Sequence, residues 1–436
     1  YLQVFNRLEQ YFVLGHVPDK IELIIMGGTF PAFQKKYQDE FITYALKAMN
    51  DFSKLFFKKS NLNIKELKKF FEIPSNINNI KRIERIKKHL KKIKGKSKLE
   101  KEQKRNENSK IRCIGLTIET RPDYASLKEA NQLLRLGTTR VELGVQSVYN
   151  ESLNAIERGH SVEDSIKAIR ILKDLGFKLN FHYMIGLPKS NPKKDLNGLK
   201  LLFRDSDFQP DMLKIYPCMV LKGTKLYKEY KQKKYRPITT KQAINIISEF
   251  KKEIPEYVRI MRIQRDIPTK FTEAGPDKNN LRQYIEKELI NKKIKCRCIR
   301  CREIKNKIPG KIHVRVISYG ASKGREFFIS IVDSNDCLIG FLRLRIPSSY
   351  LRKEIKNDSA LVRELHVYSP MTQIGKKSRK SQQHKGYGKK LLRLAEKIAR
   401  INGKNKVVVI SGVGVRQYYS KLGYKREGPY MTKTLK

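Results

Sequence analysis

The sequence predicts an α/β partial barrel followed by a smaller α+β domain. Three observations support this fold class. The chain has 436 residues, enough for two or three domains, and short apolar runs alternate with helical patterns up to about residue 235. After Pro309 the pattern changes to closely spaced strands. We therefore place the barrel in residues 1–235, a linker in 236–308 and the α+β domain in 309–436.

Five short apolar runs predict the strands of the first domain. They begin at Ile21, Ile111, Arg140, Leu179 and Met212, and amphipathic helical segments that end at glycine lie between them. Nearly continuous apolar strands that alternate with helices are typical of a parallel sheet with helical crossovers. The carboxyl ends of the strands carry the chemistry in parallel barrels, so the functional residues of this domain are expected there.

One segment interrupts this alternation. Residues 57–110 include the run IKRIERIKKHLKKIKGKSKLEKEQKRNENSK, in which nearly every side chain is charged or polar. Such a composition favours a solvated helix and loop, with non-specific contact to phosphates as a further use.

The last domain begins with the strand patterns IHVRVISY, EFFISIVDS and CLIGFLRLRI. The segment LVRELHVY, a glycine-rich turn, a helical stretch, KVVVI and a final strand follow. Hairpins that precede a strand–turn–helix–strand unit indicate an α+β domain.

The charge balance points to a polyanionic partner. The chain carries 94 Lys and Arg against 43 Asp and Glu, a formal net charge of +51. Nucleic acid is favoured over a merely lysine-rich composition, because acidic residues do not keep pace. The chain has neither an 18-residue apolar run nor a signal peptide, and its six cysteines suit reduced thiols. We therefore expect a cytoplasmic protein with no membrane span.

The sequence Gln383-His384-Lys385-Gly386-Tyr387-Gly388 precedes the helical stretch of the last domain. Glycines let the backbone approach a pyrophosphate, and a helix amino terminus supplies unpaired N–H groups. This sequence resembles the core motif of the GNAT acetyltransferases. The resemblance implies an acetyl-CoA site that comprises Glu364, Leu365, His366, Val367, Gln383, Gly386, Tyr387 and Gly388. It also implies a tyrosine that protonates the departing thiolate, either Tyr418 or Tyr419.

A longer series of motifs covers nearly the whole chain. IIMGGTF, IETRPD, GVQS, HYMIGLP, LKIYP and RIQRDIP occur in this order, followed by CRCIRCRE and RELHVY. The series resembles the catalytic subunit of Elongator and its single-protein archaeal and bacterial relatives. That family joins a radical S-adenosylmethionine (SAM) barrel to a GNAT domain, and it carboxymethylates carbon-5 of the tRNA wobble uridine. In its proposed mechanism, a SAM-derived radical activates the acetyl methyl group, whose carbon then adds to the base.

The family resemblance implies a set of cofactor contacts in the barrel. For SAM these are Gly27, Gly28, Thr29, Glu119, Arg121, Gln146 and His182. Lys35 would reach the CoA from the barrel side. Radical SAM enzymes also bind a 4Fe–4S cluster through cysteines before the first barrel helix, whereas the first cysteine here is Cys113, within a strand. We expect the cluster segment upstream of Tyr1, with loss of the segment as the alternative, so this chain alone is not expected to hold the cluster.

The linker carries Cys296, Cys298 and Cys301 with C-x-C-x-x-C spacing. Three thiolates this close can hold one tetrahedral soft metal ion, for which zinc is the default. We expect Cys218 as the fourth ligand; the alternatives are Cys113, His313 and Cys337.

Three arginines near the domain junction, Arg259, Arg262 and Arg265, are predicted to contact the tRNA backbone, with salt bridges to Asp266 and Glu273 as the alternative. The expected substrate is the anticodon stem-loop, and a homodimer or larger complex stays open. Two other functions compete: protein lysine acetylation with Glu364 as general base, and a non-catalytic RNA-binding scaffold.

Overall fold

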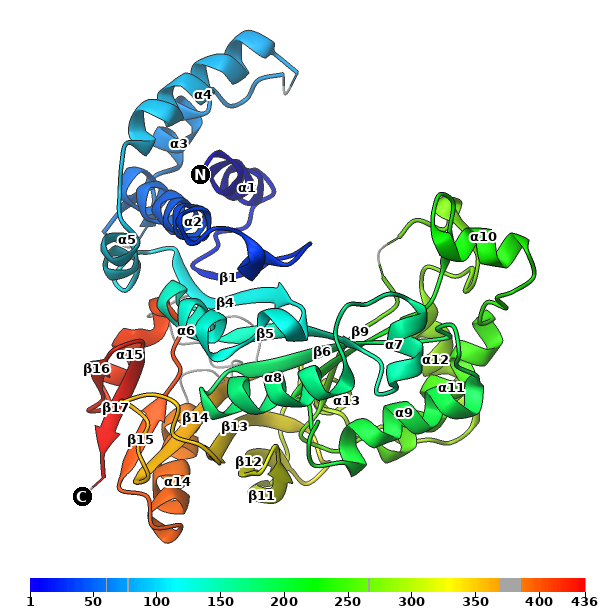
Figure 1. Cartoon of the computed structure of the whole chain (residues 1–436). Coiled ribbons are helices and arrows are strands. Elements are labelled where there is room, and N and C mark those ends of the chain that lie inside the picture. Colours follow the sequence, from blue (N-terminus) through cyan, green and yellow to red (C-terminus); the bar gives the residue numbers. More distant parts are fainter. Residues whose placement is uncertain (60, 77, 266, 369–385, 436) are drawn as a thin grey trace.

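The computed structural model describes residues 1–59, 61–76, 78–265, 267–368 and 386–435. Its first sheet has six parallel strands in the order β1–β4–β5–β6–β7–β9 (Figure 1). The strands are β1 Lys20–Ile25, β4 Arg112–Thr120, β5 Arg140–Gln146, β6 Lys178–Ile185, β7 Met212–Pro217 and β9 Arg259–Ile263. The predicted partial barrel is confirmed, and a sixth strand comes from the RIMRI segment.

Helices connect these strands in the predicted alternation. α8 illustrates why they form: Ser161 and Asp164 make a capping box at its start, and Ala168, Ile169 and Leu172 bury one face. The connecting helices are α6 Leu127–Leu136, α7 Asn150–Ala155, α8 Val162–Asp174 and α9 Pro192–Arg204, and α11 Thr240–Glu253 precedes β9.

The charged segment after α2 (Lys35–Phe56) is more ordered than its composition suggests. It forms the short strands β2 Phe57–Lys58 and β3 Asn61–Leu62, then α3 Ile64–Phe70, α4 Ile80–Lys94 and α5 Leu99–Asn106. α5 packs against α2, where Asn50 donates to Glu102 Oε2 at 2.8 Å and accepts from Asn106 Nδ2 at 2.9 Å. The expected solvated loop is therefore wrong for α5, because buried polar side chains there satisfy one another.

The carboxyl-terminal domain is one seven-stranded sheet in the order β11–β12–β13–β14–β15–β17–β16. Its elements are β11 Ile312–Ala321, β12 Gly324–Asp333, β13 Leu338–Ile346, β14 Ser359–Val367, α14 Tyr387–Ile401, β15 Lys406–Val409, α15 Arg416–Ser420, β16 Lys425–Glu427 and β17 Tyr430–Thr434. β14 pairs with β15 only from Ser359 to Val362, although it stays on β13 as far as Val367. β15 ends opposite Val362, so β14 extends beyond it.

A buried charge network joins the two domains. Arg363 of β14 makes a bidentate pair with Asp211, at 2.6 and 2.8 Å, and donates to the Phe177 carbonyl at 2.7 Å. Arg345 of β13 lies 2.6 Å from Asp174. The network's cations are Lys173, Arg343, Arg345 and Arg363, and its carboxylates are Asp174, Asp211, Glu326 and Glu364. The charges balance, so each buried ion has a counter-charge within the seam, although Arg343 Nη1 makes no hydrogen bond there.

Asp174 is the last residue of α8, and Asp211 directly precedes β7, so the second domain packs on the amino-terminal ends of the barrel strands (Figure 1). Within the described ranges, no helix has both the length and the apolar character needed to cross a membrane.

Candidate active site

Predicted SAM contacts at the carboxyl ends of β1 and β4 lie beside His182, which is inside β6. The Gly27 N–H donates to Glu119 Oε2 at 3.1 Å, which ties the GGT turn to the end of β4. Ligand atoms of Glu119, Glu142 and His182 all lie within 4.8 Å of one another. The structure thus brings three predicted residues, Gly27, Glu119 and His182, into one cluster.

Two members of this cluster were not predicted. Glu142 of β5 is buried and accepts from His182 Nε2 at 2.8 Å, and the Lys214 ammonium contacts both Glu142 and Glu119. Burial alone would raise the pKa of Glu142, but the His182 hydrogen bond and the Lys214 charge lower it to about 2. The signal in the sequence was a charged residue inside an apolar strand, in VELGV and MLKIY.

The same row of charges continues along the inner face of the barrel. Arg140 lies 3.8 Å from Glu142 and 3.7 Å from Glu22 of β1. Lys178 at the start of β6 is close enough to Glu22 and to Glu364 of β14 to interact with both charges. Charged side chains therefore extend from the barrel mouth to the second domain.

The structure shows the local surroundings of the remaining predicted SAM contacts but does not link them to this cluster. Arg121 is held by Asp123 at 2.6 and 2.9 Å and by the Gly159 carbonyl at 2.9 Å. Gln146 ends β5 with a left-handed backbone, φ 64°. Gly28 and Thr29 follow Gly27 in the same turn. Their contacts with SAM stay predictions, as does the reach of Lys35, which is exposed at the start of α2.

The second site lies at the start of α14. Gly386 caps this helix with φ 85°, a conformation that favours glycine, and Tyr387 is its first residue. A Cβ on Gly388 would lie 2.8 Å from the Tyr418 hydroxyl, so Tyr418 contacts the turn closely. Gln383 lies outside the described residues.

The geometry separates the two tyrosines that the sequence left equivalent. The Tyr418 side chain is 39% exposed, whereas Tyr419 is 6% exposed and packs in the core beside Tyr424. Burial raises the pKa of both hydroxyls, so both stay protonated near neutral pH, and access to the turn distinguishes them. Tyr418 is therefore the better candidate for the acid, and Tyr419 serves the core.

Glu364, Leu365, His366 and Val367, predicted as part of the acetyl-CoA site, form the end of β14 beyond Val362. Leu365 and His366 still pair with β13, and because β15 ends opposite Val362, their other edge has no strand partner among the described residues. A CoA arm can use this edge as an additional strand would.

Family models match both domains of the chain. The Radical SAM superfamily matches residues 6–196, the Radical SAM C-terminal domain 210–291, and the GNAT acetyltransferase family 310–424. The tRNA uridine(34) acetyltransferase of Methanocaldococcus infernus is 46% identical over all of this chain and 76% of its own length. The chain belongs to the tRNA uridine(34) acetyltransferase family. The family matches imply acetyl-CoA, SAM and a 4Fe–4S cluster as cofactors.

Other members of the tRNA uridine(34) acetyltransferase family agree with this assignment. Human Elongator complex protein 3 is 36% identical over all of this chain and 74% of its own length. A solved structure of the Methanocaldococcus infernus Elp3 with residues 1–46 deleted superimposes with a TM-score of 0.86 at 46% identity. That match covers 100% of this chain and 95% of the other.

In this family member, the side chain of Glu364 is poorly suited to act as a general base. Its carboxylate accepts from Arg343 Nε at 2.9 Å. Burial would raise its pKa, but Arg343 and Lys178 hold it below its usual range. A carboxylate stabilised in its charged form is a weak proton acceptor, so the geometry disfavours lysine acetylation through Glu364.

The cysteine motif forms a compact group in this family member. The sulfur atoms of Cys296, Cys298 and Cys301 lie within 4.8 Å of one another, and Lys251 Nζ is 3.7 Å from Cys301 Sγ. Hydrogen bonds from Cys296 and Cys301 hold the pKa of Cys298 far below its usual range. The set suits a thiophilic metal ion.

The prediction of Cys218 as fourth ligand is wrong. Cys218 follows the carboxyl end of β7 and packs with Leu187, Val220 and Tyr235. The cysteine motif instead joins the amino-terminal end of β9, where Ile299 N–H donates to the Val258 carbonyl at 2.8 Å. Within the described ranges, Cys113, His313 and Cys337 do not join the group either.

The three predicted RNA-binding arginines lie in different environments. Arg259 pairs with Glu303 and donates to the Tyr368 hydroxyl at 3.0 Å, so its side chain is already partnered within the protein, and its contact with tRNA stays a prediction. Arg262 and Arg265 are exposed, and the Arg265 guanidinium lies 5.7 Å from the Tyr216 ring centre. These two keep the predicted role, and Asp266 lies outside the described residues.

Proposed function

We propose that this chain acts on carbon-5 of the tRNA wobble uridine, with acetyl-CoA as the donor of the two carbons. The observation that carries this proposal is the row of charged side chains between the two sites. It runs from Glu119 and Glu142 at the SAM mouth through Arg140 to Lys178, beside Glu364 of β14. The row connects the segment that matches the Radical SAM superfamily with the segment that matches the GNAT family, whereas protein acetylation needs only the second.

The residues of each site have separate tasks. Gly27 and Glu119 would hold the amino group of SAM, which with its cluster supplies a carbon-centred radical when bound. The turn at Gly386 and Gly388 would hold the CoA pyrophosphate through backbone N–H groups. Tyr418 would donate its hydroxyl proton to the thiolate that leaves when the thioester is hydrolysed.

Stimulation by RNA tests this function. We expect tRNA to accelerate acetyl-CoA hydrolysis by at least about tenfold, because a base in the cleft completes the thioester site. The measurement is release of free CoA thiol, with tRNA, histone-like peptides or no acceptor. Acceleration by peptides alone would favour protein acetylation, and no turnover would favour an RNA-binding scaffold.

We further propose that Cys296, Cys298 and Cys301 bind zinc, with the fourth position filled by a group other than Cys218. The thiolates come from one short segment, and Lys251 offsets part of their charge. A zinc ion would fix the linker against β9.

Metal analysis distinguishes the two cysteine environments. We expect about one zinc per chain in the wild type and in Cys218→Ser, and loss of most zinc in Cys298→Ser. Both thiols are buried, so the pair is matched in exposure. Equal zinc content in the two variants would contradict the assignment.

A further inference from the structure

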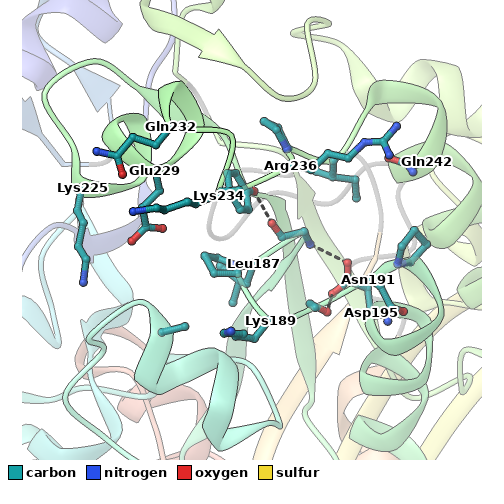
Figure 2. A pocket seen from close by; sticks show the side chains of 18 of the residues that line it. Leu187, Lys189, Asn191, Asp195, Lys225, Glu229, Gln232, Lys234, Arg236 and Gln242 are labelled. Atoms are coloured by element: carbon teal, nitrogen blue, oxygen red, sulfur yellow. Dashed lines mark hydrogen bonds between the residues drawn. The ribbon is translucent and has the colours of Figure 1, made fainter.

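A second cavity opens at the carboxyl edge of the barrel, outside the SAM cluster (Figure 2). Its volume is about 920 Å³, and it lies between the loop after β6, α10 (Lys225–Lys231) and the segment that leads into α11. Five cationic side chains line it: Lys189, Lys225, Lys228, Lys234 and Arg236. We call this cavity the basic pocket.

The floor of the basic pocket is held by hydrogen bonds. The Tyr235 hydroxyl donates to the Gly186 carbonyl at 2.6 Å, and the Gly186 N–H donates to Asp195 Oδ2 at 2.7 Å. Ser190 donates to the other oxygen of Asp195 at 2.5 Å. These contacts fix the loop after β6, so the pocket exists before any ligand arrives.

The net charge of the pocket lining is positive, and most of its cations have no carboxylate partner among the described residues. Asp195 accepts hydrogen bonds from Gly186 and Ser190 in the floor of the pocket, and Glu229 is the other carboxylate in the lining. Lys225 pairs with Glu157. Within the described ranges, Lys189, Lys234 and Arg236 have no ion pair, and all three are exposed. Figure 2 shows Lys225 and Lys234 on one side of the opening and Lys189 on the other.

We propose that the basic pocket binds phosphodiester groups of the tRNA next to the base that is modified. This inference rests on the proposed function. Gly186 directly follows β6, four residues beyond His182 of the SAM cluster, which corresponds to about 13 Å along a strand. An RNA strand held in the pocket can therefore place a nearby base at the barrel mouth.

The shape favours an RNA backbone over a small phosphate compound. The cations come from three separate segments and surround a wide opening, an arrangement that follows a chain of phosphates. A site for one small anion would instead focus several buried donors on one point.

Two charge-matched double variants of the full chain test the proposal. Lys189→Gln with Lys234→Gln removes two pocket cations. Lys305→Gln with Lys323→Gln removes two exposed lysines of the linker and of the β11–β12 turn, and Lys189 and Lys323 share a left-handed backbone, φ 62°. Labelled tRNA is titrated by fluorescence anisotropy at several salt concentrations, and thermal unfolding checks that each variant is folded.

We expect the pocket variant to bind tRNA at least about fivefold more weakly at 0.15 M salt. Its plot of log affinity against log salt should be shallower by about 1 to 2, whereas the control should change by less than about twofold. Equal affinities and slopes for the two double variants would overturn the pocket assignment alone. ATP, titrated in the same way, is the small polyphosphate probe, and a pocket variant that loses ATP binding but keeps its tRNA affinity would also overturn the pocket assignment. A wild-type chain that binds no tRNA would overturn the proposed function together with this inference.

Discussion

Asp211→Asn is expected to lower the free energy of unfolding by about 3–5 kcal/mol, because it leaves Arg363 buried without its charged partner. Both side chains are fully buried, and the two guanidinium–carboxylate distances are 2.6 and 2.8 Å. The loss is a large share of the stability of a typical domain, about 5–15 kcal/mol. Chemical denaturation followed by circular dichroism measures it.

The matched control for this prediction is Glu253→Gln. Glu253 also pairs with two cations, Lys200 and Arg204, but its side chain is 44% exposed. Exposed pairs contribute at most about 1 kcal/mol, so this variant should stay close to the wild type. Similar losses of unfolding free energy in the two variants would mean that burial does not increase the contribution of an ion pair to stability in this protein.

The same network makes the stability of the fold depend on pH in the acidic range. Burial would raise the pKa of Asp211, but Arg363, Lys173 and Arg343 hold it below its usual range. A depressed carboxyl pKa stabilises the fold above the unfolded value of about 3.9, and this contribution is lost as pH falls below that value. The wild type should therefore lose stability below about pH 4, and Asp211→Asn should lose less over that range.

Gly388→Asp is expected to weaken CoA binding by at least about 100-fold. The new carboxylate would stand beside the pyrophosphate, and repulsion between two unit charges about 4 Å apart is about 4 kcal/mol at an effective dielectric constant near 20. Its Cβ would also lie 2.8 Å from the Tyr418 hydroxyl. Isothermal titration with CoA measures the change.

Gly403→Asp is the control for this substitution. Gly403 lies just past the other end of α14, is exposed, and has no atom within 4 Å of an added Cβ. It should bind CoA like the wild type apart from a small strain effect on the fold at φ 69°. Equal binding by Gly388→Asp and Gly403→Asp would show that the pyrophosphate lies elsewhere.

The sequence predicted those parts of the fold that follow from local pattern. Apolar runs between helices located five of the six barrel strands, and the glycine turn before α14 located the acetyl-CoA domain. Both signals are short-range, since hydrophobic period and backbone conformation are set within a few residues. The family motifs then placed Gly27, Glu119 and His182 on one edge.

The errors concern contacts between distant segments. Cys218 has a suitable side chain for a metal but lies at the opposite end of the sheet from Cys298. The sequence also did not show that Arg259, which has a suitable charge for RNA, pairs with Glu303 and Tyr368. Glu142 was overlooked because it lies inside β5, between Val141 and Leu143, and not at the carboxyl end of the strand. The type of a residue determines which interactions it can make, whereas the tertiary fold determines which partner it meets.

The balanced seam between the domains also has a mechanical meaning. Four cations and four carboxylates interlock there, so a hinge motion would expose several ions at once and cost more than a substrate could supply. The spacing between the acetyl donor and the barrel mouth is therefore set when the chain folds. Any movement that brings the reacting groups together must therefore come from loops and from the RNA, while the two domains keep a fixed separation.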